Sequence, residues 1–316
     1  MRYLIFGGSG YLGSHLTLQL LVAGHELVNF DNQSGHLVTV FKPNVITIQG
    51  DITSTADLSK LEKYGKFDGV FHLAAKKSVS ESITHPNLYM QVNVTGTKKI
   101  IDFCIDNQIK NIVFTSSAAV YGDGVTTKID ENSEKVPMNP YGKSKLLSEA
   151  ILEDHCLKYG ISSVALRSFN IVGAAKQDYY DDQGENVIPI ITRSLKNKHI
   201  FRIFGGDFDT KDGTCVRDYV NVSDVASAHT SAMSYLEKQP AGMYKSINVC
   251  SGSGTSMLEL VQIVNNNSKI QLDWIIGDRR IGDPASVVGN NDLANKLLGW
   301  RPSVAIEQSI KESLNA

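Results

Sequence analysis

The sequence lacks the features that mark several large classes of protein. Its 316 residues include only 4 cysteines and 2 tryptophans, and 31 Lys plus Arg stand against 33 Asp plus Glu without a long block of either sign. No apolar run approaches the ~20 residues that are needed to span a bilayer. These absences argue against a nucleic-acid-binding surface, a membrane span and attraction to an anionic membrane.

Metal and disulfide chemistry also finds little support in the sequence. Cys104, Cys156, Cys215 and Cys250 lie far apart, no C-x-x-C pair occurs, and the 8 histidines have no ligand spacing. We therefore expect four reduced, buried thiols and no metal site. The chain enters a strand pattern at its first residues, which leaves no room for a secretory signal, so the expected location is the cytoplasm.

Glycine, in contrast, occurs at a spacing that indicates a ligand. An apolar run at residues 3–6 leads directly into Gly7-Gly-Ser-Gly10-Tyr-Leu-Gly13. Strand, tight turn and helix in this order are typical of a dinucleotide site, because glycine lets the backbone approach a pyrophosphate and the helix N-terminus offers unpaired N–H groups. The apolar stripe of the expected helix consists of Leu12, Leu16, Leu20 and Ala23.

A carboxylate stands where such a cofactor would place its adenosine ribose. Asp31 follows the apolar run at residues 27–30 and could accept hydrogen bonds from both ribose hydroxyls. The alternative is that Asp31 only opens a turn with Asn32. No Arg or Lys follows at residues 32–34 to bind a 2′-phosphate, so the sequence favours NAD over NADP.

Strand and helix patterns alternate as far as Arg167, which predicts an α/β fold with a Rossmann-type, doubly wound parallel sheet. We place a cofactor-binding domain at residues 1–167 and a smaller C-terminal substrate-binding domain at 168–316, and residues 217–250 could return to the first sheet. Two long polar loops, 172–187 and 205–217, are expected to contact substrate. The main expected strands are residues 3–6, 27–30, 45–49, 69–73, 111–115 and 163–167, and the main helices are residues 88–107 and 140–160.

The strongest chemical motif is Tyr141-Gly-Lys-Ser-Lys145, on the helix that Asn139-Pro140 is expected to open. A tyrosine and a lysine four residues apart share one face of a helix. A phenolate base that works near neutral pH needs its pKa lowered by about three units, and a close cation supplies ~1–3 of them. Because Ser116-Ser117 ends the preceding strand and a dinucleotide turn opens the chain, we prefer this reading to that of a half-buried tyrosine beside a solvated lysine.

Taken together, these motifs resemble the extended short-chain dehydrogenase/reductases, and among them the UDP-glucose (UDP-galactose) 4-epimerases, from end to end. The supporting stretches are Lys77-Ser-Val-Ser-Glu-Ser82, Asn93-Val-Thr-Gly96, Ser117 with Val120-Tyr121-Gly122, Arg167-Ser-Phe-Asn170, Asp212-Gly-Thr-Cys-Val-Arg-Asp-Tyr219 and Arg279-Arg-Ile-Gly-Asp283.

The resemblance implies a mechanism with bound NAD and a transient 4-keto sugar. Tyr141 would take the proton from the sugar 4-hydroxyl while hydride passes from C4 to NAD. Ser117 would hydrogen-bond the same oxygen, and Lys145 would hold the nicotinamide ribose and lower the pKa of Tyr141. The keto sugar would then turn and receive the hydride on its other face.

The resemblance also implies the residues that line the site, and a homodimer built from the helices at 88–107 and 140–159. For NAD it implies Gly7, Gly10, Tyr11, Leu12, Gly13, Asp31, Asn32, Asp51, Ile52, Ala74, Ala75, Lys77, Asn93, Tyr141 and Lys145. For the UDP-sugar it implies Ser117, Asn170, Asn186, Val187, Phe204, Arg217, Tyr219, Arg280 and Asp283. The two arginines suit a pyrophosphate, because a guanidinium can bond two oxygens at once.

Three positions depart from the family pattern. Ser168 replaces an aromatic residue that usually packs beside the nicotinamide, and the loop at residues 32–42 is short. Val287 stands where a bulky residue would exclude N-acetylated sugars. Because valine is small, we expect UDP-N-acetylglucosamine to be accepted as well.

Three other functions were weighed. A sugar-nucleotide 4,6-dehydratase usually has an Asp-Glu pair directly after the serine or threonine at this strand end, and this chain has Ala118-Ala119 there. A UDP-uronic acid 4-epimerase stays open, because it needs only a different contact to C6. An NAD-sensing binding protein of the same fold would have no need of Ser117, Tyr141 and Lys145 together.

Overall fold

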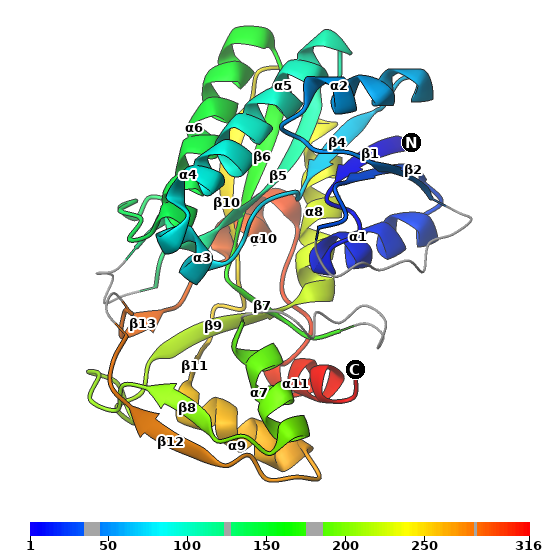
Figure 1. Cartoon of the computed structure of the whole chain (residues 1–316). Helices are drawn as coiled ribbons and strands as arrows, with labels where there is room; N and C mark the ends of the chain where they lie inside the picture. Colours follow the sequence, from blue (N-terminus) through cyan, green and yellow to red (C-terminus); the bar gives the residue numbers. More distant parts are fainter. Residues whose placement is uncertain (35–44, 123–127, 175–185, 281–282) are drawn as a thin grey trace.

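The computed structural model describes residues 1–34, 45–122, 128–174, 186–280 and 283–316. Its larger part is built on a parallel sheet of seven strands in the order β10-β6-β5-β4-β1-β2-β3 (Figure 1). The α/β fold with a Rossmann-type sheet is therefore confirmed. The strands are β1 (Arg2–Phe6), β2 (Glu26–Asp31), β3 (Ile46–Gln49), β4 (Gly69–His72), β5 (Asn111–Ser117), β6 (Ser162–Ser168) and β10 (Tyr244–Val249).

Helices cover both faces of this sheet, which explains why its central strands are apolar on both sides. In β1, Leu4, Ile5 and Phe6 are all fully buried. Ile5 packs into the core under α1 and α8, whereas Leu4 and Phe6 pack into the core under α5 (Figure 1). The helices of this part are α1 (Tyr11–Val22), α2 (Thr55–Leu58), α3 (Val79–Thr84), α4 (Pro86–Tyr89), α5 (Gly96–Asp106), α6 (Pro140–Tyr159), α8 (Val222–Leu236) and α10 (Asp292–Leu298), with 3₁₀ turns η1 (Ser59–Tyr64) and η3 (Ala118–Val120).

Local sequence sets the ends of α6. The Asn139 side chain accepts a hydrogen bond from the N–H of Gly142 at 2.9 Å, Pro140 fills the first helical position, and Gly160 ends the helix in the left-handed conformation at φ 67°. Cap, proline and terminal glycine each satisfy a backbone requirement that only a few residue types meet. The predicted helix at 140–160 is accordingly found with almost the predicted bounds.

The predicted helix at 88–107 is less regular than expected. It consists of α4, a π-helical segment η2 (Met90–Thr95) and α5. A π-helical turn inserts an extra residue and is often found at functional sites. Here it holds the buried Asn93, whose amide bonds the backbone of Lys76 and the hydroxyl of Ser144 on α6.

The smaller part of the molecule has its own sheets and core. Strand β9 (Val216–Asn221) pairs with β7 (Asn170–Val172), β11 (Gly254–Ser256) and β13 (Ser286–Val287), and β8 (Phe201–Phe204) pairs with β12 (Trp274–Gly277). Helices α7 (Val187–Asn197), α9 (Met257–Asn267) and α11 (Ile306–Leu314) contribute to this core (Figure 1). The segment 217–250 is divided: β9 lies in the smaller part, whereas α8 and β10 belong to the large sheet and its cover.

Two further features of the sequence can be compared with the structure. The four cysteines are free and buried, as predicted. Within the described ranges, no helix is long and apolar enough to cross a membrane, and no group of three or more His, Cys, Asp or Glu side chains is placed to hold a metal ion.

The lowered pKa values of two buried histidines predict how the free energy of unfolding depends on pH. Burial lowers the pKa of His72 to about 3 and that of His229 to about 4, from an ordinary value of 6.5. Between those values the unfolded chain binds more protons than the folded one, so the free energy of unfolding should fall as pH falls from about 6.5 to 4. For His229 the loss is about 3 kcal/mol at pH 4.

Denaturant unfolding at a series of pH values measures this loss, with His229→Gln as the comparison. The glutamine cannot titrate, so the variant should lose less stability on acidification than the wild type does. Parallel pH curves for the two proteins would contradict the prediction.

Candidate active site

The three glycines of the first turn have different physical roles. Gly7 has φ +85°, and a Cβ there would lie 2.6 Å from the backbone N of Ala74. A Cβ on Gly13 would lie 2.7 Å from the Cα of Gly8, so α1 can pack on the turn only without a side chain. A Cβ on Gly10, in contrast, would meet only the Gly7 carbonyl, at 3.6 Å. The protein itself thus requires Gly7 and Gly13, whereas Gly10 leaves space that suits a pyrophosphate.

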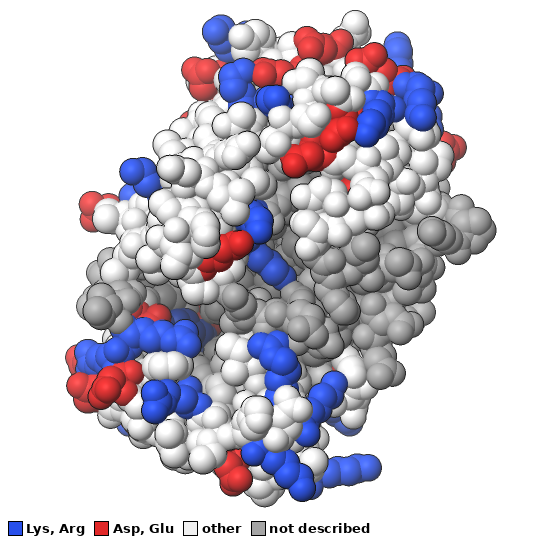
Figure 2. Space-filling view, viewed as in Figure 1, with Lys and Arg blue, Asp and Glu red and all other residues white. Residues whose placement is uncertain are grey.

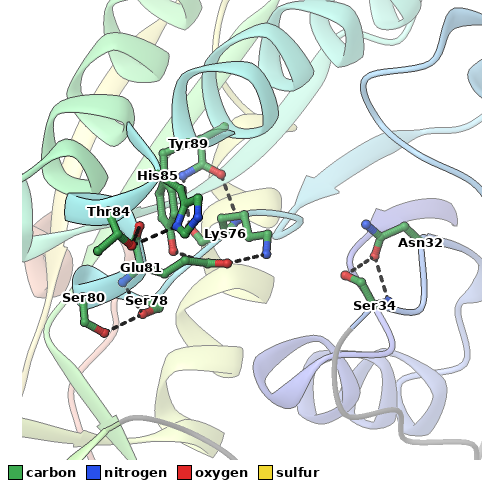
Figure 3. A network of polar contacts seen from close by, with 10 residues as sticks. Asn32, Ser34, Lys76, Ser78, Ser80, Glu81, Thr84, His85 and Tyr89 are labelled. Carbon is green, nitrogen blue, oxygen red and sulfur yellow. Dashed lines mark hydrogen bonds and ion pairs between the residues drawn. The ribbon is translucent and has the colours of Figure 1, made fainter. Parts of the chain in front are cut away.

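Asp31 ends β2 beside this turn. Its carboxylate accepts hydrogen bonds from the N–H groups of Ser9 and Gln33, at 3.1 and 2.8 Å. The ribose and turn interpretations are therefore compatible, because Asp31 closes a turn and also faces the glycine loop. Burial raises the pKa of Asp31, and the two N–H groups oppose that rise. Asn32 is exposed and accepts from the backbone and the hydroxyl of Ser34 (Figure 3).

The other predicted cofactor residues follow β3 and β4 at the same sheet edge, but several of them have structural duties. Ile52 is buried in the core beneath α5, and Leu12 in the core beneath α1. Asp51 accepts from the backbone and hydroxyl of Thr53, both at 2.7 Å. Ala74 and Ala75 are half-buried after β4, and Lys77 is exposed. The remainder of the predicted short loop 32–42, from residue 35 on, lies outside the described residues.

Ser117, Tyr141 and Lys145 meet where β5 and α6 face each other. The Ser117 hydroxyl hydrogen-bonds the phenol of Tyr141. Lys145 is 3% exposed and donates from Nζ to the carbonyl of Thr115 at 2.8 Å, with its ammonium 4.8 Å from the centre of the Phe114 ring. A hydroxyl, a phenol and a buried amine thus lie together at the carboxyl end of a parallel sheet, the edge where open α/β sheets bind ligands.

The expected lowering of the pKa of Tyr141 is not what the protein chain by itself shows. Burial raises the pKa of Tyr141, and the hydrogen bond with Ser117 offsets only part of that rise. The Lys145 ammonium is directed to the Thr115 carbonyl. The sequence argument considered the charges near the phenol but did not include its desolvation, which works in the opposite direction.

A second group of predicted residues gathers in the smaller part. The Arg217 guanidinium lies 3.7 Å from the Asp283 carboxylate and donates to the Pro284 carbonyl at 2.9 Å. Arg280 stacks on the Phe204 ring, 3.8 Å from its centre. Burial raises the pKa of the Cys215 thiol, and the charges of Arg217, Asp283 and Arg280 all act on it.

Four further predicted substrate residues lie on β7, on β9 and at the start of α7. Tyr219 is buried, and its hydroxyl contacts the sulfur of Met257 at 3.8 Å. The Asn170 amide donates to the Asp218 carbonyl at 3.0 Å and the residue is exposed. Asn186 precedes α7 and Val187 begins it. Residues 175–185 of the predicted loop 172–187 lie outside the described residues.

Sequence reasoning missed an ion pair close to Tyr141. Glu81 accepts from the Lys76 ammonium at 3.0 Å and from the Tyr89 hydroxyl at 2.8 Å (Figure 3). The Tyr89 ring packs edge to face with Tyr141, with ring centres 6.4 Å apart. The two hydrogen bonds lower the pKa of Glu81.

Figure 2 shows charged side chains inside a hollow between the larger and smaller parts of the molecule.

Comparison with known proteins agrees with this site. Residues 3–250 match the NAD dependent epimerase/dehydratase family, and the chain belongs to that family. It is 38% identical over 311 residues to the UDP-glucose 4-epimerase of Lacticaseibacillus casei, which covers 96% of this chain and 92% of the relative. This match confirms the resemblance that the sequence motifs indicate.

Solved structures show the same fold over nearly the whole chain. The UDP-glucose 4-epimerase of Stenotrophomonas maltophila, with bound NAD and formylated UDP-arabinopyranose, has a TM-score of 0.93 and 31% identity and covers 99% of this chain and 97% of its own. That of Bifidobacterium longum, with NAD+ and UDP, has a TM-score of 0.91 and 30% identity and covers 100% and 97%. NAD is thus the cofactor of the family to which this chain belongs.

The glycine turn predicts different outcomes for two substitutions. Gly10→Ala should leave the melting temperature of the NAD-free protein nearly unchanged, because the added methyl group meets little protein, but should weaken NAD binding about tenfold or more by blocking close approach. Gly13→Ala should destabilise the fold itself by about 1–3 kcal/mol through overpacking. The measurements are NAD released per chain on denaturation and melting temperature. Full NAD retention by Gly10→Ala would refute the assignment.

Proposed function

We propose that the protein catalyses NAD-dependent 4-epimerisation of UDP-hexoses, interconverting UDP-galactose and UDP-glucose through a transient 4-keto sugar. The observation that carries the proposal is the meeting of Ser117, Tyr141 and Lys145 at the sheet edge that also holds the Gly7–Gly13 turn. The names of its relatives support it, since the proteins from Lacticaseibacillus casei and Rhizobium meliloti are both UDP-glucose 4-epimerases.

The residues of the site divide the work on the sugar 4-hydroxyl. The Gly7–Gly13 turn and Asp31 would hold NAD, which would supply a hydride acceptor for C4. Tyr141 takes the hydroxyl proton as the C4 carbonyl forms and returns it when the alcohol is restored. Ser117, whose hydroxyl acts on the pKa of the Tyr141 phenol, would hydrogen-bond the same oxygen. C4 would be inverted if the keto sugar presents its other face before hydride returns to C4 and the proton returns to the oxygen.

Lys145 supplies positive charge next to this proton transfer. A cation near the phenol stabilises the phenolate, and the positive nicotinamide ring of oxidised NAD would add to that effect. Because burial alone raises the pKa of Tyr141, the base would reach its working strength only once the cofactor is bound. The arrangement would confine strong base activity to the loaded enzyme.

The smaller part would hold the UDP group. Arg217 and Arg280 present guanidinium groups that suit a pyrophosphate, and Asp283 helps to orient Arg217. The Phe204 ring stacks on one face of the Arg280 guanidinium. This stacking would leave the edge of the guanidinium available for oxygen atoms. Such a grip on the nucleotide would leave the sugar ring free to turn between the two half-reactions.

We also propose a homodimer built on the helices at 88–107 and 140–159. Leu147 and Leu157 of α6 are 40% and 78% exposed, which is costly for large apolar side chains that remain in water. The mass of the protein in solution would test this assembly. The cytoplasmic location stays a prediction of the sequence.

Replacing the proposed base gives the sharpest test of the reaction. Tyr141→Phe should lower turnover of UDP-galactose to UDP-glucose, assayed without added NAD, by roughly 10²–10⁴-fold, while UDP-sugar binding stays largely intact. Tyr159→Phe removes a hydroxyl from the last turn of the same helix, at an exposed position, and should leave turnover unchanged. Near-normal activity in Tyr141→Phe would refute the assigned role.

The small side chain of Val287 predicts a broader choice of sugar. Val287 pairs with Arg217 across β13 and β9 and packs beside Tyr121 and Phe169. The solved UDP-Glc/GlcNAc 4-epimerase of Campylobacter jejuni, which has a TM-score of 0.87, 31% identity and covers 99% of this chain and 98% of its own, is a family precedent for acting on both sugars.

We expect turnover of UDP-N-acetylglucosamine by the wild type and its loss in Val287→Tyr, with UDP-glucose turnover kept. Product analysis of both substrate pairs provides the measurement. A wild type that epimerises only the UDP-glucose pair would contradict the prediction.

A further inference from the structure

Glu149 is a buried carboxylate to which the proposed reaction assigns no part. It lies on α6, four residues after Lys145 and eight after Tyr141, so the three side chains share one face of the helix. Only 4% of Glu149 is exposed. A carboxylate this deep in a protein needs partners for both oxygens, and the identity of those partners indicates what it does.

One partner connects Glu149 to β5, the strand that ends in Ser117. The Ser116 hydroxyl donates to Oε1 of Glu149 at 2.5 Å, and Ser116 directly precedes Ser117 on β5. Lys145 reaches the same strand one residue earlier, at the Thr115 carbonyl. Two successive residues of β5 are thus fastened to α6 immediately before the serine that faces Tyr141.

The other partners of the carboxylate come from β6 and β10. Arg167 of β6 donates from Nε to Oε1 at 3.0 Å and from Nη2 to Oε2 at 2.6 Å, and the Tyr244 hydroxyl of β10 donates to Oε2 at 3.4 Å. Arg167 also donates to the Tyr121 hydroxyl at 2.8 Å. A two-point guanidinium contact fixes the plane of the carboxylate as well as its charge.

Glu149 serves as the counter-charge of Lys145, because the other titratable groups named around that lysine are neutral or already paired. His72 of β4 is buried close by, and burial, assisted by the Lys145 charge, lowers the pKa of that histidine and keeps it neutral. Tyr141 of α6 is a neutral phenol with a raised pKa, and on its other side Glu81 is already paired with Lys76. Burial lowers the pKa of Lys145 to about 7, and the Glu149 charge opposes that fall.

We propose that Glu149 is a positioning residue for the proton-transfer group. By holding Ser116 it aligns the end of β5 with Tyr141, and by placing a fixed negative charge one helical turn from Lys145 it keeps that buried lysine a cation. The inference rests on the proposed function, because its importance for turnover depends on Tyr141 and Lys145 acting as described.

Glu149→Gln tests the charge while keeping the shape of the side chain. The pH dependence of kcat with UDP-galactose should change, with the fall at high pH moved down by about one unit, because Lys145 loses its proton more readily. At a pH where the wild type is fully active, kcat should fall about tenfold, whereas KM should change less than about twofold. Ser116→Ala should lower kcat without moving the pH profile, because it removes the alignment and leaves the charge.

A direct readout does not depend on turnover. NMR of protein with ¹³C-labelled lysine, in which the Lys145 signal is identified by its absence in Lys145→Arg, should show a lower pKa of Lys145 in Glu149→Gln than in the wild type. Glu153→Gln is the matched control, since it changes the same residue type one turn further along α6 at an exposed position. It should leave the pH profile and the Lys145 signal unchanged.

The outcomes separate the possible roles. An unchanged pKa of Lys145 and an unmoved pH profile in Glu149→Gln, with only a lower melting temperature, would overturn the proposal and leave Glu149 a structural partner of Arg167. If Glu149→Gln does not fold because it strands the buried Arg167, the double variant Glu149→Gln with Arg167→Met removes both charges and should still lower the pKa of Lys145. Failure of the proposed function is distinguishable, because the wild type would then show no turnover while the NMR comparison would still apply.

Discussion

The site depends on one constraint, which is that a parallel sheet covered on both faces leaves its strand side chains accessible to a ligand only at its edge. Strands such as β4 and β6 are buried throughout, so the strand side chains that can meet a ligand lie at or just after the last paired residues. Asp31 ends β2, Ala74 and Ala75 follow β4, and Ser117 ends β5 at the same edge. Helix α6 then adds Tyr141 and Lys145 from one side, which brings a phenol and a buried amine next to this row of strand ends.

The parts of this arrangement that depend on local chemistry could be predicted from sequence. The Gly7–Gly13 turn follows from the spacing of its glycines directly after an apolar run, and α6 follows from its cap, its proline and its final glycine. These signals need no knowledge of distant residues. The predicted strands of the large sheet are found for the same reason, since apolar runs of that length have few other folded states.

Features that depend on distant residues could not be predicted from the sequence. Nothing in residues 90–95 distinguishes a π-helical segment from an ordinary helix, and the run at 216–221 would read the same in either sheet. The direction of the pKa shift of Tyr141 required its burial to be known, and the Glu149 and Arg167 pair joins residues 18 apart in the chain. The spacing of four between Lys145 and Glu149 is nevertheless visible in the sequence, and it places both side chains on one face of the helix.

A hydrogen bond between the start of α1 and the end of β7 connects the larger and smaller parts of the molecule. Tyr11, the first residue of α1 after the glycine turn, donates from its hydroxyl to the carbonyl of Gly173 at 2.5 Å, just beyond β7. Gly173 has φ +95°, and a Cβ there would lie 2.5 Å from the Asn221 amide, so its carbonyl is aimed by a backbone that only glycine permits at low cost. The hydrogen bond therefore fixes the first residue of α1 against the end of β7, and a motion that separated these two segments would have to break it. The residue that begins the helix behind the glycine turn is thus held in place from the smaller part of the molecule.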